Sequence, residues 1–145
     1  MHDFPHHYRV AASADAEGDV SLTSEGLETI LSLPPREFGG PGDRWSPETL
    51  LVAAVADCFI LSFRAIARAS KLSWIALRCE VEGVLRRQDG ITKFTGFNVR
   101  ATLDVPSGTN QERAQRLMTK AEQTCLITNS LSGPAHLEAV VNEVP

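Results

Sequence analysis

The chain has 145 residues, 43% of them apolar and 22% charged, and this balance is ordinary for one soluble globular domain over residues 1–145. The formal net charge of −4 argues against a nucleic-acid partner, because phosphate binding requires a basic surface. The longest apolar run, residues 50–63, is interrupted by Asp57 and is too short to span a bilayer, so we expect no membrane partner. No basic segment followed by an apolar one opens the chain, so we expect no signal peptide.

The first third of the chain predicts three short strands. Turn signals AEGD and SEG separate residues 8–12, 19–24 and 28–33, which we expect to pair as an antiparallel meander. The segment PPREFGGPGDRW, rich in proline and glycine, then predicts a loop that ends at Ser46.

A long apolar helix is predicted over residues 47 to about 70. Ser46 suits the N-cap, Pro47 the first helical position, and Glu48 the positive end of the helix dipole. The length and near-continuous apolar character predict a central, buried helix.

The second half of the chain alternates strands with one further helix. Residues 74–87 and 93–105 alternate around the turn QDG and predict a long hairpin. Residues 109–125 predict an amphipathic helix capped by Asn110 or Thr109, with Cys125 on its apolar stripe. A short turn or helical piece (LITNSLSG) and a strand at 136–141 follow. The order β-β-β-α-β-β-α-β predicts an α+β fold with segregated strands and helices.

The three cysteines, Cys58, Cys79 and Cys125, are widely spaced and form no CxxC pair. This pattern argues against a secreted disulfide framework and against a structural zinc site. A cytoplasmic protein whose free thiols are either buried or redox-active fits best. Because no cofactor-binding or metal-binding motif occurs, we expect no cofactor and no metal.

Cys58 and Cys125 each have two interpretations. Cys58 lies on an apolar stripe of the long helix with Leu61, where a free cysteine is usually a packing residue. Its activation would require a positive charge or a hydrogen-bond donor from elsewhere. The two thiols are either independent core residues or a peroxidatic and a resolving thiol that meet inside the fold. Cys79 is expected to be a core residue of its strand.

Glu48 precedes Cys58 by ten residues, which is about 15 Å along a helix and too far for contact within one helix. Glu48 is therefore either an acid that interacts with the helix dipole or a group that serves Cys58 of a second chain. The second interpretation predicts a twofold homodimer in which antiparallel helices cross near Ala53 and Ala54.

The stretches SPETLLVAAVADCF and KAEQTCLITNSL resemble the OsmC/Ohr family of osmotically induced and organic-hydroperoxide-resistance proteins. The shared pattern is an [NS]-P-E helix start, a cysteine ten residues after the glutamate, and a second cysteine at the end of a later helix. The meander, the PPREFGG loop and the closing strand extend the resemblance over nearly the whole chain.

The resemblance implies an intertwined homodimer, with two central helices packed between outer sheets and two active sites at the interface. It also implies thiol-dependent reduction of organic hydroperoxides in oxidative stress defence, with a lipoylated or thioredoxin-like protein as the dithiol reductant. By the same resemblance, Cys58 is the peroxidatic thiol that becomes a sulfenic acid, and Cys125 is the resolving thiol. Glu48 is the acid that holds a catalytic arginine.

The family arginine has no direct counterpart. In the Ohr branch it lies in the first hairpin, where this chain has Glu17, and in the OsmC branch it lies in the loop before the central helix. That loop offers Arg36 and Arg44, and we expect Arg36 to act as the surrogate, because an apolar pocket does not stabilise a thiolate. The alternative is an OsmC-like dimer that senses redox state or binds hydrophobic ligands without turnover.

Overall fold

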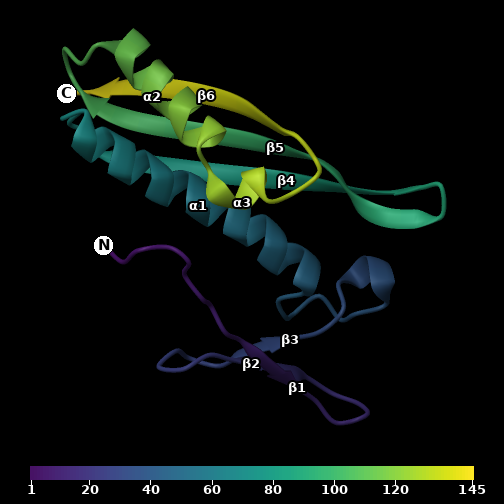
Figure 1. The fold of residues 1–145 in the computed structure, drawn as a ribbon. Coiled ribbons are helices and arrows are strands. Elements are labelled where there is room, and N and C mark those ends of the chain that lie inside the picture. Colours follow the sequence, from purple (N-terminus) through teal and green to yellow (C-terminus); the bar gives the residue numbers. More distant parts are fainter. The chain divides into compact units, whose positions relative to one another are not determined.

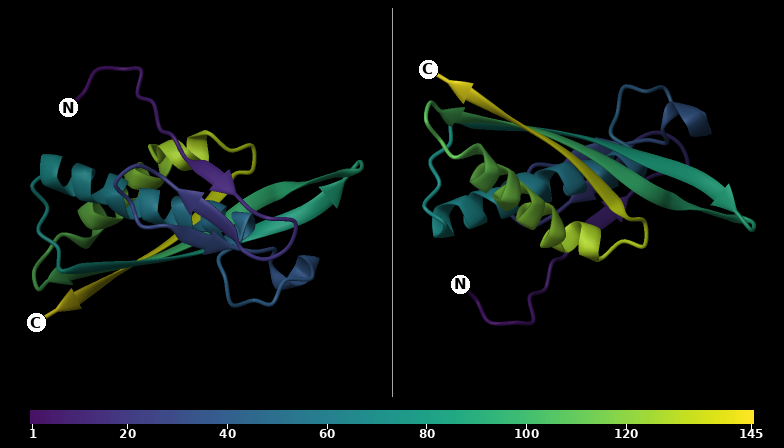
Figure 2. Two further views of the ribbon diagram at one scale, coloured as in Figure 1. Left: turned by 90° about the horizontal axis from the view of Figure 1, so that it is seen from below. Right: turned by 90° about the horizontal axis from the view of Figure 1, so that it is seen from above.

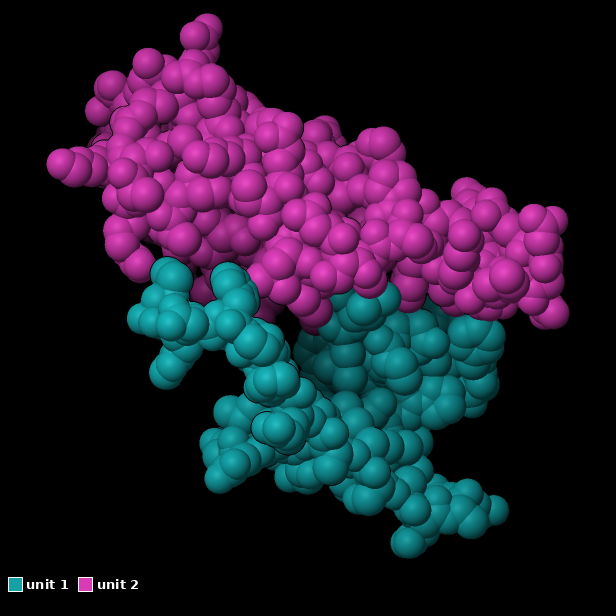
Figure 3. All heavy atoms as spheres, in the orientation of Figure 1, with its two compact units in different colours: residues 1–51 teal, residues 52–145 magenta.

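A computed structural model describes all 145 residues, and Figure 1 shows the order of their helices and strands. The chain divides into two compact units, unit 1 (Met1–Leu51) and unit 2 (Val52–Pro145), which Figure 3 distinguishes by colour. The expectation of a single domain over residues 1–145 stays a prediction.

Unit 1 carries a three-stranded sheet with the order β1-β2-β3. Its strands are β1 (Ala11–Ser13), β2 (Val20–Thr23) and β3 (Ile30–Ser32). Both pairings are antiparallel, which confirms the predicted meander. The strands are shorter than expected. In particular, β1 begins at Ala11 because the three residues before it have no partner strand.

The loop after β3 contains a single turn of 3-10 helix, η1 (Arg36–Phe38), which the sequence did not predict. The carbonyl of Pro35 accepts hydrogen bonds from the amides of Phe38 and Gly40, at 3.0 and 2.9 Å. The loop then returns to β3, where the amide of Leu33 donates to the carbonyl of Trp45 at 3.0 Å. These bonds hold the loop against the strand and bring the chain to the start of the long helix.

Helix α1 (Pro47–Ala69) has 23 residues and begins where the sequence predicted. The hydroxyl of Ser46 accepts from the Thr49 amide at 3.1 Å, and the Thr49 hydroxyl accepts from the Ser46 amide at 2.9 Å. This reciprocal pair satisfies two donors at the start of the helix. The boundary between the two units falls inside α1, after Leu51.

In length and composition α1 is also apolar enough to cross a membrane, which corrects the expectation drawn from residues 50–63. A single helix of this kind is weak evidence for a membrane span, because the core helix of a globular protein has the same character.

Unit 2 carries the second three-stranded sheet, with the order β4-β5-β6. Its strands are β4 (Ala76–Gln88), β5 (Ile91–Pro106) and β6 (Ala135–Val144). β4 and β5 form the predicted hairpin, and the positive φ angles of Asp89 and Gly90 make its tight turn. β6 pairs in parallel with β5, since helix α2 intervenes and carries the chain back across the sheet.

Helix α2 (Gln111–Gln123) is capped by Asn110, whose side-chain oxygen accepts from the Arg113 amide at 3.0 Å. The prediction that this helix extends to Cys125 is wrong. Thr124 closes α2, and Cys125 takes an extended conformation immediately before the short helix α3 (Leu126–Asn129). The predicted element order is otherwise confirmed, with η1 added and the expected short helical piece present as α3, and the fold is α+β.

Both α2 and the part of α1 in unit 2 lie on one face of the β4-β5-β6 sheet (Figure 2). The buried residues of α1 recur about once per helical turn and form one stripe: Val55, Phe59, Phe63 and Ala67. The expected stripe through Cys58 and Leu61 is therefore wrong, because Leu61 is 52% exposed. Cys58 lies beside the buried stripe, so its sulfur is only partly covered by hydrocarbon.

Candidate active site

Cys58 lies on α1, one residue before the buried Phe59. Its side chain is half-buried and reduced. The hydroxyl of Ser62, one helical turn further along, lies 3.8 Å from the Cys58 sulfur. Spacing of four residues places two side chains on the same face of a helix, so this contact follows directly from the sequence.

Cys125 is buried, with 2% of its surface exposed, and its thiol donates a hydrogen bond to the Cys58 sulfur. The position of Cys125 immediately before α3 explains a second set of hydrogen-bond donors to the Cys58 sulfur. The first amides of a helix have no partner within it, and the amides of Leu126 and Ile127 donate to the Cys58 sulfur. The structure therefore brings Cys58 and Cys125 together within unit 2.

These contacts shift the pKa values of the two thiols in opposite directions. Burial raises the pKa of Cys58, but the Ile127 amide, the Cys125 thiol and the Ser62 hydroxyl outweigh burial and lower that pKa below its ordinary value. Burial raises the pKa of Cys125, and the neighbouring Cys58 raises it further. One thiol of the pair is therefore poised to ionise while the other keeps its proton.

Cys79 lies on β4, paired with Ala101 of β5. Burial raises its pKa to about 11, with further contributions from the nearby Cys125 and Glu80. A thiol with this pKa is protonated at neutral pH and is a poor nucleophile.

Glu48 belongs to unit 1, where it contributes to an apolar cavity of about 490 Å³. The cavity is lined by residues of β1, β2, β3, the loop and the first turn of α1: Ala12, Val20, Leu22, Ser32, Leu33, Pro34, Pro35, Phe38, Pro47, Glu48 and Leu50. The Oε1 atom of Glu48 is buried and has no hydrogen-bond partner. A buried acceptor without a partner costs free energy, so this carboxylate oxygen is available to accept a hydrogen bond that it does not receive within the chain.

The arginines of unit 1 differ in their contacts. Arg44 forms an ion pair with Asp19, with 3.3 Å between Nε and Oδ1. Arg36 is exposed, forms no ion pair with Glu48, and lies over the backbone of Gly42, which has a φ of +83°. Glu17 is exposed in the turn between β1 and β2. Arg36 is thus a free cation of unit 1, whereas Arg44 is engaged.

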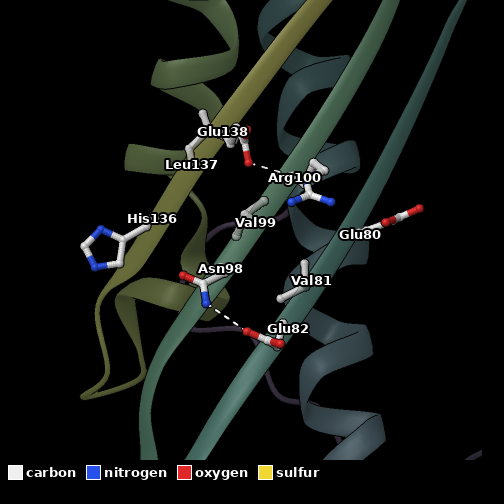
Figure 4. A pocket seen from close by; sticks show the side chains of 9 residues that line it. All are labelled: Glu80, Val81, Glu82, Asn98, Val99, Arg100, His136, Leu137 and Glu138. Carbon is white, nitrogen blue, oxygen red and sulfur yellow. Dashed lines mark hydrogen bonds and ion pairs between the residues drawn. The ribbon is translucent and has the colours of Figure 1, made fainter.

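A second hollow, of about 470 Å³, lies on the open face of the β4-β5-β6 sheet (Figure 4). Four of its polar side chains are paired with one another: Arg100 with Glu138 at 3.4 Å, and the Asn98 amide with Glu82 at 3.0 Å (Figure 4). No cysteine lines it. No group of three His, Cys, Asp or Glu side chains in the chain is arranged to hold a metal ion.

The sequence did not identify Ser62 or the amides of α3 as neighbours of Cys58. The four-residue spacing from Cys58 to Ser62 was a readable signal, since it places both on one helical face. Nothing in the sequence indicated the role of the α3 amides. The break between α2 and α3, which directs these amides toward Cys58, contains no glycine or proline.

With this fold and this pair of thiols, the chain belongs to the OsmC-like protein family, whose pattern residues 40–139 match. It is 34% identical over 126 residues to an organic hydroperoxide resistance protein of Xanthomonas axonopodis pv. citri, covering 84% of each chain. It is also 28% identical over 138 residues to an uncharacterized protein, YmaD, of Bacillus subtilis, covering 92% of this chain and 91% of YmaD.

Solved structures of the same family share the fold. An OsmC-like protein of unknown function from Vibrio cholerae superposes with a TM-score of 0.83 at 19% identity, covering 94% of this chain and all of the other. An organic hydroperoxide resistance protein from Legionella pneumophila superposes with a TM-score of 0.76 at 28% identity, covering 98% of this chain and all of the other. The first shows the fold, and the second extends the similarity to a protein named for resistance to peroxides.

Proposed function

We propose that this protein is a thiol-dependent peroxidase that reduces organic hydroperoxides in the cytoplasm as part of oxidative stress defence. The observation that carries the proposal is the pair of adjacent thiols, Cys58 with a lowered pKa and Cys125 with a raised pKa. The organic hydroperoxide resistance proteins among its relatives support the choice of substrate class.

In the proposed reaction the Cys58 thiolate attacks one oxygen of the peroxide bond. An S–O bond forms, the O–O bond breaks, and the alkoxide takes up a proton and leaves as an alcohol. Cys58 is then a sulfenic acid. The sulfur of Cys125 attacks the Cys58 sulfur, an S–S bond forms, and the hydroxyl leaves as water with the proton of the Cys125 thiol. The raised pKa of Cys125 keeps that proton available until this step.

The catalyst is restored by an external dithiol, which we propose to be a lipoylated or thioredoxin-like protein. One of its thiolates attacks the Cys58–Cys125 disulfide to form a mixed disulfide, and its second thiol completes the exchange. The two electrons that reduced the peroxide thereby come from the dithiol, which leaves as a disulfide.

We place Glu48 and Arg36 in the same active site, contributed by a second copy of the chain in a homodimer. Helical rise separates Glu48 and Cys58 of one chain by about 15 Å, so a shared site requires two chains. The buried and unpartnered Oε1 atom of Glu48 supports this, as does the apolar cavity around it, which suits the alkyl part of an organic hydroperoxide. Arg36 is the proposed cation because Arg44 is paired with Asp19.

The test is peroxide consumption by the purified chain with a dithiol reductant. We expect cumene hydroperoxide to be reduced faster than hydrogen peroxide, Cys58→Ser to abolish turnover, and Cys125→Ser to stop the reaction after one equivalent. A Cys58→Ser variant as active as the unmodified chain would end the proposal.

A second candidate function is a module that binds a hydrophobic ligand or senses redox state without turnover. The observation that favours it is the cavity of about 490 Å³ in unit 1, together with an Arg36 that contacts no acidic side chain. This candidate predicts reversible formation of one Cys58–Cys125 disulfide with no catalytic cycle. Mass spectrometry after a single addition of peroxide, compared with steady-state kinetics, separates the two.

A further inference from the structure

We propose that Ser62 is a catalytic residue of this protein, whose hydroxyl donates a hydrogen bond to the Cys58 sulfur and stabilises its thiolate form. The proposal rests on the proposed peroxidase function, because it assigns a role at the same sulfur. It adds, from within the same helix, a side-chain hydroxyl donor to the donors that Cys125 and α3 contribute.

The geometry of the Ser62 side chain is unusual for a helix. A serine or threonine inside a helix ordinarily returns its hydroxyl to the carbonyl four residues earlier. Thr119 and Thr124 of this chain do so, donating to the carbonyls of Gln115 and Lys120 at 3.1 and 2.8 Å. Ser62 makes no such bond, and its hydroxyl instead lies 3.8 Å from the Cys58 sulfur. The hydroxyl is therefore free to serve the thiol.

The direction of the bond depends on the state of the sulfur. When Cys58 is protonated, either group can donate, and the bond is one between two neutral groups. When Cys58 is a thiolate, only Ser62 can donate, and a hydrogen bond to a charged acceptor is about twice as strong. The contact therefore favours the thiolate over the thiol.

The other groups around Cys58 show why the Ser62 hydroxyl is important as a donor. Within one chain, the groups that act on the sulfur are uncharged, and the Cys125 thiol is the titratable one among them. The remaining donors are the amides of Leu126 and Ile127, which α3 contributes whatever the side chains are. Ser62 is thus the one non-cysteine side chain that a substitution can remove from the Cys58 sulfur.

The contact affects the first half of the proposed catalytic cycle. A larger thiolate fraction at neutral pH speeds the attack of Cys58 on the peroxide.

The test is the pH dependence of iodoacetamide alkylation at Cys58, followed by mass spectrometry of its peptide in Ser62→Ala. Loss of a hydrogen bond to a charged acceptor is expected to cut the thiolate fraction at pH 7 by about tenfold. The alkylation rate should fall by about threefold, since the remaining thiolate is more nucleophilic. The midpoint of the profile should move to higher pH.

Two variants make the result specific. Ser62→Thr keeps a hydroxyl at the same position and is expected to restore the profile. Thr119→Ala removes a helical hydroxyl that bonds a carbonyl on α2 and is expected to leave the profile unchanged. Alanine is a better helix former than serine, so we expect Ser62→Ala to fold, and circular dichroism checks this.

A Ser62→Ala profile that superposes on that of the unmodified chain would overturn the assignment, and so would a shift that Ser62→Thr fails to reverse. Alkylation requires no peroxide, so the outcome is independent of turnover. If the unmodified chain alkylates as expected but never turns over peroxide, the proposed function fails while the role of Ser62 in thiolate stabilisation stands.

Discussion

At the scale of single residues, hydrogen bonding decides which thiol of unit 2 is reactive. Burial acts on Cys58, Cys79 and Cys125 in the same direction, toward the protonated form. Cys58 alone has enough donors around its sulfur to reverse that effect. The amides of α3 and the hydroxyl of Ser62 thus perform part of the role that a cation performs at other reactive cysteines.

This difference predicts an order of alkylation. With limiting iodoacetamide at pH 7, Cys58 should be modified first, because its pKa is lowered and a larger fraction of it is thiolate. Cys79, with a pKa of about 11, should be modified last and only at strongly alkaline pH. Peptide mass spectrometry over a pH series measures the order, and early labelling of Cys79 would contradict it.

Glu48 supports a prediction that separates activity from stability. Because Oε1 has no partner within the chain, Glu48→Gln should change the free energy of unfolding by less than about 1 kcal/mol. Peroxide turnover should fall at least tenfold if the carboxylate orients the catalytic cation, as a lost charge-assisted bond would imply. Glu37→Gln, which removes an exposed carboxylate from η1, is the matched control. A large loss of stability with full activity would contradict the assignment.

The sequence was sufficient to select Cys58 and Cys125 as candidates, because their motif spacing is visible without a structure. It misplaced Cys125 on α2, since the apolar stripe of that helix continues to residue 125 in the sequence. In the structure the Thr124 amide bonds back to the carbonyls of Lys120 and Glu122, and the helix ends there. A helix that ends without glycine or proline leaves no mark in the sequence.

At the scale of elements, the start of α1 was predicted correctly because three local preferences coincide at Ser46, Pro47 and Glu48. Parallel pairing of β6 with β5 was not predicted. The alternation of apolar and polar residues in β6 shows which face is buried, but it carries no information on the neighbouring strand or its direction.

The cap of α1 gives a stability prediction. Ser46 is buried at 1% exposure and exchanges hydrogen bonds with Thr49, so Ser46→Ala should lower the free energy of unfolding by about 1 kcal/mol. Chemical denaturation measures the loss. Ser107→Ala, at an exposed turn, should change it by less than about 0.5 kcal/mol. Equal effects of the two substitutions would show that the cap contributes nothing.

The packing of α1 on the hairpin gives a second prediction at this scale. A Cβ at Gly83 would lie 2.7 Å from a methyl of Val52 and 2.9 Å from the ring of Phe94. Gly83→Ala should therefore destabilise the protein by about 1–3 kcal/mol. Gly96 is paired with Val84 on the same hairpin, but a Cβ there would meet only the Pro134 carbonyl at 3.6 Å. Gly96→Ala should be nearly neutral, and the reverse order of effects would contradict this packing.

At the scale of the whole molecule, α1 is more apolar than one chain requires. Its buried residues form a single stripe from Val55 to Ala67, while Leu61 on another face is 52% exposed. Apolar surface of this kind is normally covered, and the predicted homodimer would cover it with a second α1. Sedimentation should therefore report a dimer at micromolar concentration, and a monomer would remove the basis for a site shared between chains.

The composite site makes the most discriminating prediction. Alone, Glu48→Gln should keep at most about a tenth of the unmodified activity, and Cys58→Ser should have none. When the two variants are co-expressed, a mixed dimer contains one site with both residues intact and one site with neither. Random pairing then restores about a quarter of the activity of the unmodified chain, because half of the dimers are mixed and each has one working site.

If Glu48 and Cys58 instead served one another within a chain, no mixed dimer would contain an intact site. Co-expression would then give no more activity than Glu48→Gln has alone. Tagging each variant differently and purifying through both tags isolates the mixed dimer, which should show about half of the unmodified activity. Co-expression of Cys58→Ser with Cys125→Ser is the matched control, because both thiols lie in unit 2 of the same chain. No mixed dimer can rebuild that pair, so its activity should stay at background.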